Sequence, residues 1–89
     1  MKVIGLGDVV YWARIHEAVG IYEVCELTVR TVYPNCFVGI DKNSRQSHII
    51  SYDDCDVTVF DNRDLALAVV KEAEKRKTKE FTIDKSEEN

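Results

Sequence analysis

The segment Tyr52-Asp53-Asp54-Cys55-Asp56 divides this 89-residue chain into two stretches with different hydrophobic periods. Before it, apolar and polar residues alternate in short runs that end at turn-forming residues, which is the pattern of half-buried β-strands. After it, and after the apolar run 57–60, apolar residues recur every three or four positions, which is the pattern of an amphipathic helix. The sequence therefore predicts a group of strands followed by one helix, with the acidic segment at the junction.

Five extended runs fit the strand pattern, and the connections between them leave little room for a crossover helix. The predicted strands are residues 9–15, 21–33, 36–40, 46–52 and 56–60. Residues 16–20 are expected to form a hairpin loop, and Pro34-Asn35 supplies the chemistry of a tight turn. Glu23 and Thr31 interrupt the alternation of the second strand, as at an edge or a bulge, and we expect the bend near Glu23. Because such short connections make neighbouring strands antiparallel, we expect a small, strongly bent five-stranded antiparallel barrel.

A single helix is predicted from about residue 63 to residue 77. Asn62 is placed to cap its first turn, and Asp64 complements the positive end of the helix dipole. The predicted stripe that faces the barrel consists of Leu65, Ala66, Val69, Val70 and Ala73. Residues 78–89 are interpreted as a charged tail, with an edge strand at 81–83 and disorder in the last five residues.

Composition limits the chain to one small domain, predicted to span residues 1–77. A globule of this size buries a limited fraction of its surface, so a large active-site cavity is not expected. The three cysteines include no CxxC pair, and neither a signal peptide nor an apolar run of membrane-spanning length is visible. We therefore expect a cytoplasmic protein of a bacterial host cell, without a membrane partner.

Charge is distributed unevenly along the chain. Residues 1–62 carry five basic and nine acidic side chains, whereas residues 63–77 carry five basic and three acidic ones. An acidic body disfavours nucleic acid, because affinity for the phosphate backbone depends on Lys and Arg. A nucleic acid would therefore have to bind to the helix, although cations at that helix end also suit the negative pole of its dipole.

Three segments share an order with a known group of proteins: Gly7-Asp8-Val9-Val10-Tyr11, Ile21-Tyr22-Glu23, and Asp56-Val57-Thr58-Val59-Phe60 followed by Asn62-Arg63-Asp64-Leu65-Ala66. Over most of residues 5–76 the chain resembles small SH3-like proteins encoded by bacteriophages and mobile elements of Gram-positive bacteria. The resemblance implies an SH3-like barrel, a phage or prophage origin, and binding through loops and exposed strand faces. Asn62 stands where that group has a capping Thr, and the resemblance transfers no functional residue.

Metal-ligand and nucleophile types are present, but not at the spacing that their chemistry needs. The zinc candidates are His16, His48, Cys25, Cys36 and Cys55. They lack the two close pairs that supply most ligands of a zinc knuckle. A Cys55 nucleophile with His48 or His16 as base would also need a cleft and an oxyanion hole, which so small a barrel does not plainly offer. We expect no cofactor and no enzymatic activity.

The acidic segment and the aromatic side chains are the candidates for binding. Asp53, Asp54 and Asp56 lack the further carboxylates and the Gly of a calcium loop, which leaves an ordinary polar turn, a single weak cation site or an anionic epitope for a basic partner. Strand alternation predicts that either Tyr11 or Trp12 faces outward, as in a protein-binding hot spot, unless Trp12 anchors the core. The predicted protein-binding residues are Tyr11, Trp12, Tyr52, Asp53, Asp54 and Asp56.

The leading functional hypothesis is a non-enzymatic phage or mobile-element protein that binds another protein through acidic loops and exposed aromatics. Its most concrete version is an inhibitor of a host defence nuclease, of the anti-CRISPR kind, because an acidic protein can occupy a basic nucleic-acid channel. The alternative is a nucleic-acid-binding accessory module that uses the basic helix end, with Arg63, Lys71, Lys75, Arg76 and Lys77 as contacts. A homodimer through edge strands is a further expectation.

Overall fold

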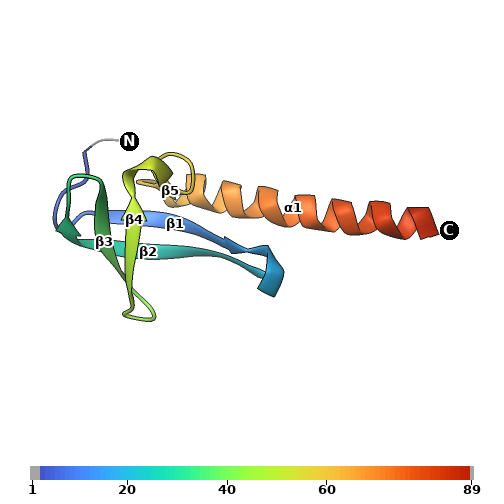
Figure 1. The fold of residues 1–89 in the computed structure, drawn as a ribbon, viewed down its shortest axis with the longest axis horizontal. Coiled ribbons are helices and arrows are strands. Elements are labelled where there is room, and N and C mark those ends of the chain that lie inside the picture. The colour runs from blue at the N-terminus through green and yellow to red at the C-terminus, as the bar shows by residue number, and fades with distance from the viewer. Residues whose placement is uncertain (1–2, 89) are drawn as a thin grey trace.

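The computed structural model describes the backbone of residues 3–88 and the side chains of residues 3–77. Within this part, the elements are β1 (Val9–His16), η1 (Glu17–Val19), β2 (Ile21–Val32), β3 (Cys36–Asp41), β4 (Ser47–Ser51), η2 (Tyr52–Asp54), β5 (Val59–Phe60) and α1 (Arg63–Glu88), where η marks a 3-10 helix. Figure 1 shows the strands as one bent layer, with α1 beginning beside β5 and extending well past the body. The predicted mainly β fold with one C-terminal helix is therefore confirmed.

The five strands form one antiparallel sheet with the order β4-β3-β2-β1-β5. Four of the predicted strands agree with the observed bounds to within one residue at each end. The fifth is shorter than predicted, because η2 and the turn after it occupy the chain until Val59. Since β4 and β5 are the two ends of this order, the sheet is bent but not closed into a barrel.

The contact between Trp12 and His48 shows how strongly the sheet curls. Trp12 lies on β1 and His48 on β4, with β2 and β3 between them, so a flat sheet would separate the two strands by about 14 Å. The centroids of the two rings are only 5.0 Å apart. Gly39 on β3 permits close packing inside the curl, because a Cβ there would lie 2.9 Å from Cβ of Leu27.

Apolar side chains are buried on both faces of β1. The inner face of the curl buries a cluster of Ile4, Val10, Cys25, Leu27, Val29, Phe37, Ile50 and Val59. The opposite face of the β1–β2 hairpin packs under α1. There Ala13 of β1 and Phe60 of β5 meet Ala66 and Val70 of the helix. The inner cluster contains the largest fully buried side chains, whereas the helix layer depends largely on small ones. β1 is thus covered on both faces along its middle part, while Val9 at its start and His16 at its end are exposed.

The irregularity in β2 lies beside Thr31, the second break in the predicted alternation, rather than at Glu23, where the bend was expected. Glu23 pairs regularly with Arg14 of β1, without a shift in register. The register of β2 against β3 instead shifts between Val29 and Thr31, so Arg30 is the extra residue of a β-bulge. The bulge occurs where β2 changes from pairing with β1 on one side to pairing mainly with β3 on the other.

Helix α1 begins as predicted but continues further. The backbone N–H of Asp64 donates to Oδ1 of Asn62 at 2.8 Å, which confirms the cap. Ala66, Val70 and Ala73 are buried, whereas Leu65 is 51% exposed because it lies about 100° around the helix from Ala66.

The backbone stays helical through residues 81–83, for which the sequence predicted an edge strand. No Gly or Pro follows residue 77, so nothing in the sequence stops the helix from propagating. Disorder was predicted for the last five residues. Their side chains, and Asn89 as a whole, lie outside the described part of the chain.

Candidate protein-binding site

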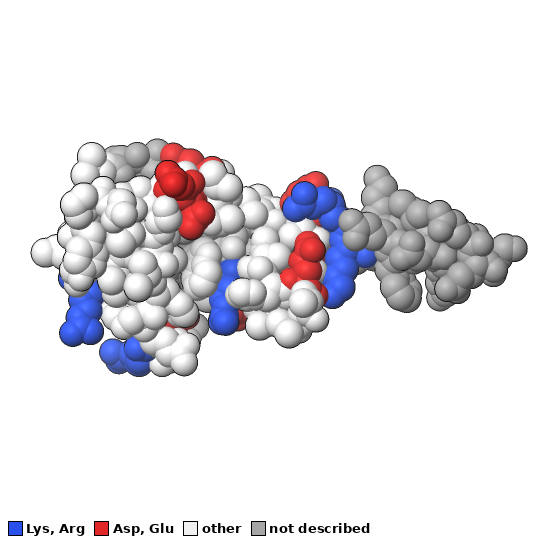
Figure 2. Space-filling view, in the orientation of Figure 1, with Lys and Arg blue, Asp and Glu red and all other residues white. Residues whose placement is uncertain are grey.

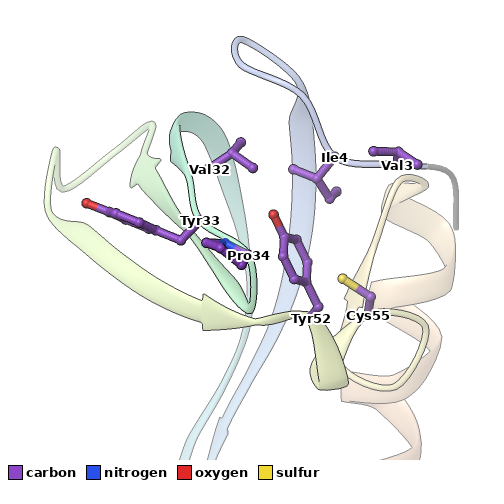
Figure 3. Close-up of a pocket in the computed structure, with 7 residues that line it drawn as sticks. All are labelled: Val3, Ile4, Val32, Tyr33, Pro34, Tyr52 and Cys55. Atoms are coloured by element: carbon purple, nitrogen blue, oxygen red, sulfur yellow. The ribbon is translucent and has the colours of Figure 1, made fainter.

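A hollow of about 410 Å³ opens where the N-terminal segment, the β2–β3 turn and η2 meet. Its lining is mainly apolar and aromatic, and consists of Val3, Ile4, Val32, Tyr33, Pro34, Tyr52 and Cys55. Figure 3 shows the Tyr52 ring near the centre of this group, with its hydroxyl directed toward the space between Val32 and Ile4, whereas the Tyr33 ring extends outward, away from Tyr52. A concave apolar surface with a few polar groups is the usual form of a binding pocket.

Hydrogen bonds of the backbone hold the two main walls of the hollow together. In the β2–β3 turn, the N–H of Tyr33 donates to the carbonyl of Cys36 at 2.8 Å, and Asn35 accepts from the N–H of Tyr52 at 3.3 Å. Ser51 then caps η2, since its hydroxyl accepts from the N–H of Asp53 at 3.1 Å. The turn and η2 are therefore fixed relative to each other without using the side chains that line the hollow.

The lining of the hollow includes one aromatic ring that packs against the core and several side chains that are exposed. Tyr52 is half-buried, and its ring lies 5.8 Å from that of Phe37 in the inner cluster. Tyr33 is 49% exposed, Val32 39% and Val3 93%. Aromatic side chains that are anchored at one end and accessible at the other are typical anchors of protein interfaces, because they bury a large area with little loss of side-chain entropy.

Carboxylates follow directly in the chain on a residue that lines this hollow. Asp53 and Asp54 are exposed and lie in the chain between Tyr52 and Cys55, two residues that line it. Asp56 is also exposed, and it adopts a left-handed backbone with φ of 65°. Figure 2 shows acidic side chains gathered on the body beside η2. The surface thus offers apolar area and negative charge side by side.

Cys55 lines the hollow with an uncharged thiol. Burial raises the pKa of its thiol, and the negative charge of Asp56 raises it further. Because the thiolate is the reactive form of cysteine, a raised pKa disfavours nucleophilic chemistry at this position. His48, its predicted partner, packs instead against Trp12.

The structure exposes neither Tyr11 nor Trp12 as a binding surface, and Trp12 instead anchors the core, which is the alternative that the sequence left open. Both are half-buried: Trp12 packs against the inner cluster and Tyr11 against the cluster under α1. Strand alternation places them on opposite faces, but each face is covered. Among the tyrosine, tryptophan and phenylalanine side chains that the structure describes, Tyr33 is the exposed one, at 49%, and it was not among the predicted protein-binding residues.

A polar group lies at the other end of the inner face, around Cys25. Arg14 pairs with Glu23 at 3.1 Å and holds its guanidinium 5.9 Å from the centroid of the Trp12 ring. Burial raises the pKa of Cys25 to about 12, with Glu23 and Asp41 adding to the shift, so this thiol is protonated at neutral pH. Among the described residues, no group of three or more His, Cys, Asp or Glu side chains is arranged to hold a metal ion.

The predicted nucleic-acid contacts on α1 do not form one surface. Lys77 lies four residues after the buried Ala73, on the face toward the body, where its Nζ donates to the carbonyl of Glu17 at 3.5 Å and lies 5.5 Å from the Tyr22 ring centroid. Lys71 and Lys75 are exposed on the opposite side. The remaining two contacts, Arg63 and Arg76, are also exposed, but 13 residues apart along the helix.

Basic side chains of the body converge at a place that sequence analysis missed. A second groove, of about 510 Å³, is lined by Thr28, Val29, Arg30, Ile40, Asp41, Lys42 and Arg45. Lys42 is partly neutralised by Glu26, 3.7 Å away. The bulge at Arg30 and the β3–β4 turn bring these cations together, although they are scattered in the sequence.

Comparison with known proteins gives no relative from which a role could be transferred. No family model matches the chain, and neither does any curated protein or solved structure. Across residues 3–88, no helix combines the length and the apolar character needed to cross a membrane.

Proposed function

We propose that this protein binds another protein, taking a basic segment with an apolar anchor residue at the hollow beside η2. The observation that carries the proposal is the apolar and aromatic lining of the hollow together with two exposed carboxylates, Asp53 and Asp54, in η2, the element that also supplies Tyr52 to the lining. An anchor side chain would pack against Tyr52 and Val32, with Tyr33 at the edge of the contact, while Lys or Arg residues on either side would meet the carboxylates. Charges of this kind mainly raise the association rate and select the partner.

The proposal also includes a fold class that is more specific than a bent antiparallel sheet. We assign the sheet to the SH3-like class, supported by the β4-β3-β2-β1-β5 order, by the strong curl and by the 3-10 helix that precedes β5. In such a fold, loops at one end of the curled sheet are the usual binding elements. The phage or prophage origin, the cytoplasmic location and the role as an inhibitor of a defence nuclease stay predictions; a basic nucleic-acid channel would have the charge that these carboxylates require.

The test is a selection of random displayed nonapeptides against the purified protein, followed by affinity measurements on the enriched sequences. We expect enrichment of peptides that flank an aromatic or aliphatic residue with Lys or Arg. Tyr33→Ala should weaken their binding about tenfold, as for a hot-spot aromatic. The double change Asp53→Asn and Asp54→Asn should mainly slow association and flatten its dependence on salt.

Asp61→Asn is the matched control, since Asp61 is an exposed acid that does not line the hollow. It should leave the affinity unchanged. Enriched peptides without basic residues would contradict the charge argument. Peptides that bind Tyr33→Ala as tightly as the wild type would show that the hollow is not the binding place.

The nucleic-acid hypothesis has less support, because Lys77 already contacts the β1–β2 hairpin and the aromatics beside the helix, Tyr11 and Tyr22, are half-buried. A gel-shift series at low salt with single-stranded DNA separates the two proposals. Protein binding at the hollow predicts no shift at micromolar protein.

A further inference from the structure

Strand β4 is an open edge of the sheet. It pairs with β3 on one side, and in the described part of the chain no strand follows it on the other. An unpaired edge presents free backbone N–H and C=O groups, which form a template for pairing with another strand. Natural edges are often protected by Lys or Pro, but β4 consists of Ser47, His48, Ile49, Ile50 and Ser51.

The hydrogen-bond pattern identifies the groups that face outward. The N–H of Asp41 donates to the carbonyl of Gln46, and the N–H of Tyr52 donates to that of Asn35, so Gln46 and Tyr52 bond toward β3 at the two ends of the ladder. In an antiparallel pair such residues alternate, which assigns His48 and Ile50 to the same side. The backbone groups of Ser47, Ile49 and Ser51 therefore point away from β3, toward the open edge.

These outward groups are symmetric about Ile49. If a second copy of β4 pairs antiparallel with Ile49 opposite Ile49, then Ser47 of each copy lies opposite Ser51 of the other, and every outward donor meets an outward acceptor. This is the self-complementarity that a two-fold dimer interface requires. The Ile49 side chain is 77% exposed on the outer face, so the pairing would also bury two isoleucines against each other.

The charges at the ends of β4 favour the same arrangement. Exposed Asp53 and Asp54 follow one end of the strand, and exposed Lys42 and Arg45 precede the other. In the view of Figure 2, acidic side chains lie on the upper part of the body and Lys and Arg side chains on its lower part. Antiparallel pairing brings the acidic end of one copy to the basic end of the other, whereas parallel pairing would juxtapose like charges.

We propose that two copies of this chain associate through β4, in an antiparallel pairing centred on Ile49 that joins the two sheets into one. The contact is short, and it therefore forms a weak, concentration-dependent dimer rather than an obligate one. The proposal concerns the strand edge and goes beyond peptide binding at the hollow.

Sedimentation velocity over a concentration series, from micromolar to about millimolar protein, tests the association. The wild type should pass from the monomer mass to twice that mass. Ile49→Lys places two ammonium groups opposite each other and should remain monomeric, while Ile49→Val should dimerise like the wild type. Because Ile49 is exposed, all three should have the same circular dichroism spectrum, and Ile49→Lys should keep the peptide affinity of the hollow.

A charge exchange tests the register itself. In the proposed pairing Asp53 of one copy faces the end of the other copy that carries Arg45, so Asp53→Arg alone and Arg45→Asp alone should each lose dimerisation. An equimolar mixture of these two variants should recover it as a heterodimer, because both charge contacts are then of opposite sign. A wild type that stays monomeric at every concentration would overturn the proposal, as would an Ile49→Lys variant that still dimerises or a mixture that stays monomeric.

Discussion

The two ends of β4 use their carboxylates in opposite ways. At the β3–β4 turn, Asp41 is only 7% exposed and accepts hydrogen bonds from the N–H groups of Asn43 at 2.7 Å and Ser44 at 3.2 Å. At η2, Asp53 and Asp54 are exposed to solvent. The first carboxylate builds the turn, while the other two are available to a partner. The formal net charge of -4 conceals this difference.

The hollows at the two ends differ accordingly. The one beside η2 has an apolar and aromatic lining, and the groove beside the β3–β4 turn contains Arg30, Lys42 and Arg45. A partner with apolar anchors and basic flanks fits the first, whereas the second has the opposite sign of charge. On the proposed function the partner binds at the η2 end, and the turn end is its electrostatic complement.

The largest effect on stability is expected from a cavity in the inner cluster, which supports both ends of β4. Leu27 is fully buried there, so Leu27→Ala should lower the free energy of unfolding by about 2–5 kcal/mol. Urea unfolding followed by tryptophan fluorescence measures it. Val57→Ala removes an exposed apolar side chain as a control and should change the free energy by less than about 0.5 kcal/mol. Equal losses in the two variants would mean that this cluster does not support the fold.

The second effect concerns the structural carboxylate. Burial alone would raise the pKa of Asp41, but the two N–H donors outweigh it and hold the pKa below its usual value. Asp41→Asn should therefore cost about 1–3 kcal/mol of unfolding free energy at pH 7.

The pH dependence of that cost follows from linkage. A carboxyl whose native pKa is depressed binds its proton more weakly in the folded state, so its stabilisation is complete well above the unfolded value of about 3.9. It is lost as pH falls through the native pKa. The difference between wild type and Asp41→Asn in urea unfolding should be constant above about pH 5 and shrink in more acidic solution. A difference that persists unchanged at pH 2 would contradict the assigned role.

The smallest effect is expected at the other end of β4. Asp53→Asn and Asp54→Asn should each change the free energy of unfolding by less than about 0.5 kcal/mol, because exposed side chains contribute little to stability. The same urea experiment at pH 7 compares them directly with Asp41→Asn. A loss as large as that of Asp41→Asn would mean that the η2 carboxylates are structural, and would remove the distinction between the two ends.

Local patterns made the elements predictable. Alternation located the strands, and Asn62 marked the start of α1, because these signals depend on neighbours in the sequence. Leu65 and the end of the helix were predicted less well. The helix stripe is centred on the small residues that approach the sheet most closely, which the spacing of apolar residues alone does not reveal.

The site was less predictable, because it depends on how the sheet curls. The alternation of apolar and polar residues predicted that Tyr11 and Trp12 lie on opposite faces of β1. It did not reveal that α1 covers one of these faces and the inner cluster the other. Ile4, Tyr33 and Tyr52 meet in the hollow only because the curl brings the N-terminal segment, the β2–β3 turn and η2 together. The acidic residues were identified because their charge is visible in the sequence itself.

Chemical-shift mapping by NMR tests directly whether a partner binds at the η2 end of β4 rather than at the turn end. The ¹⁵N-labelled protein is titrated with a basic peptide from the display selection, and the amide shifts at the two ends of β4 are compared in one spectrum. We expect saturable shifts at residues 32–33 and 52–55, with the amides of residues 42–45 unchanged. Shifts centred on 42–45, or on α1, with none around Tyr33 and Tyr52, would contradict it.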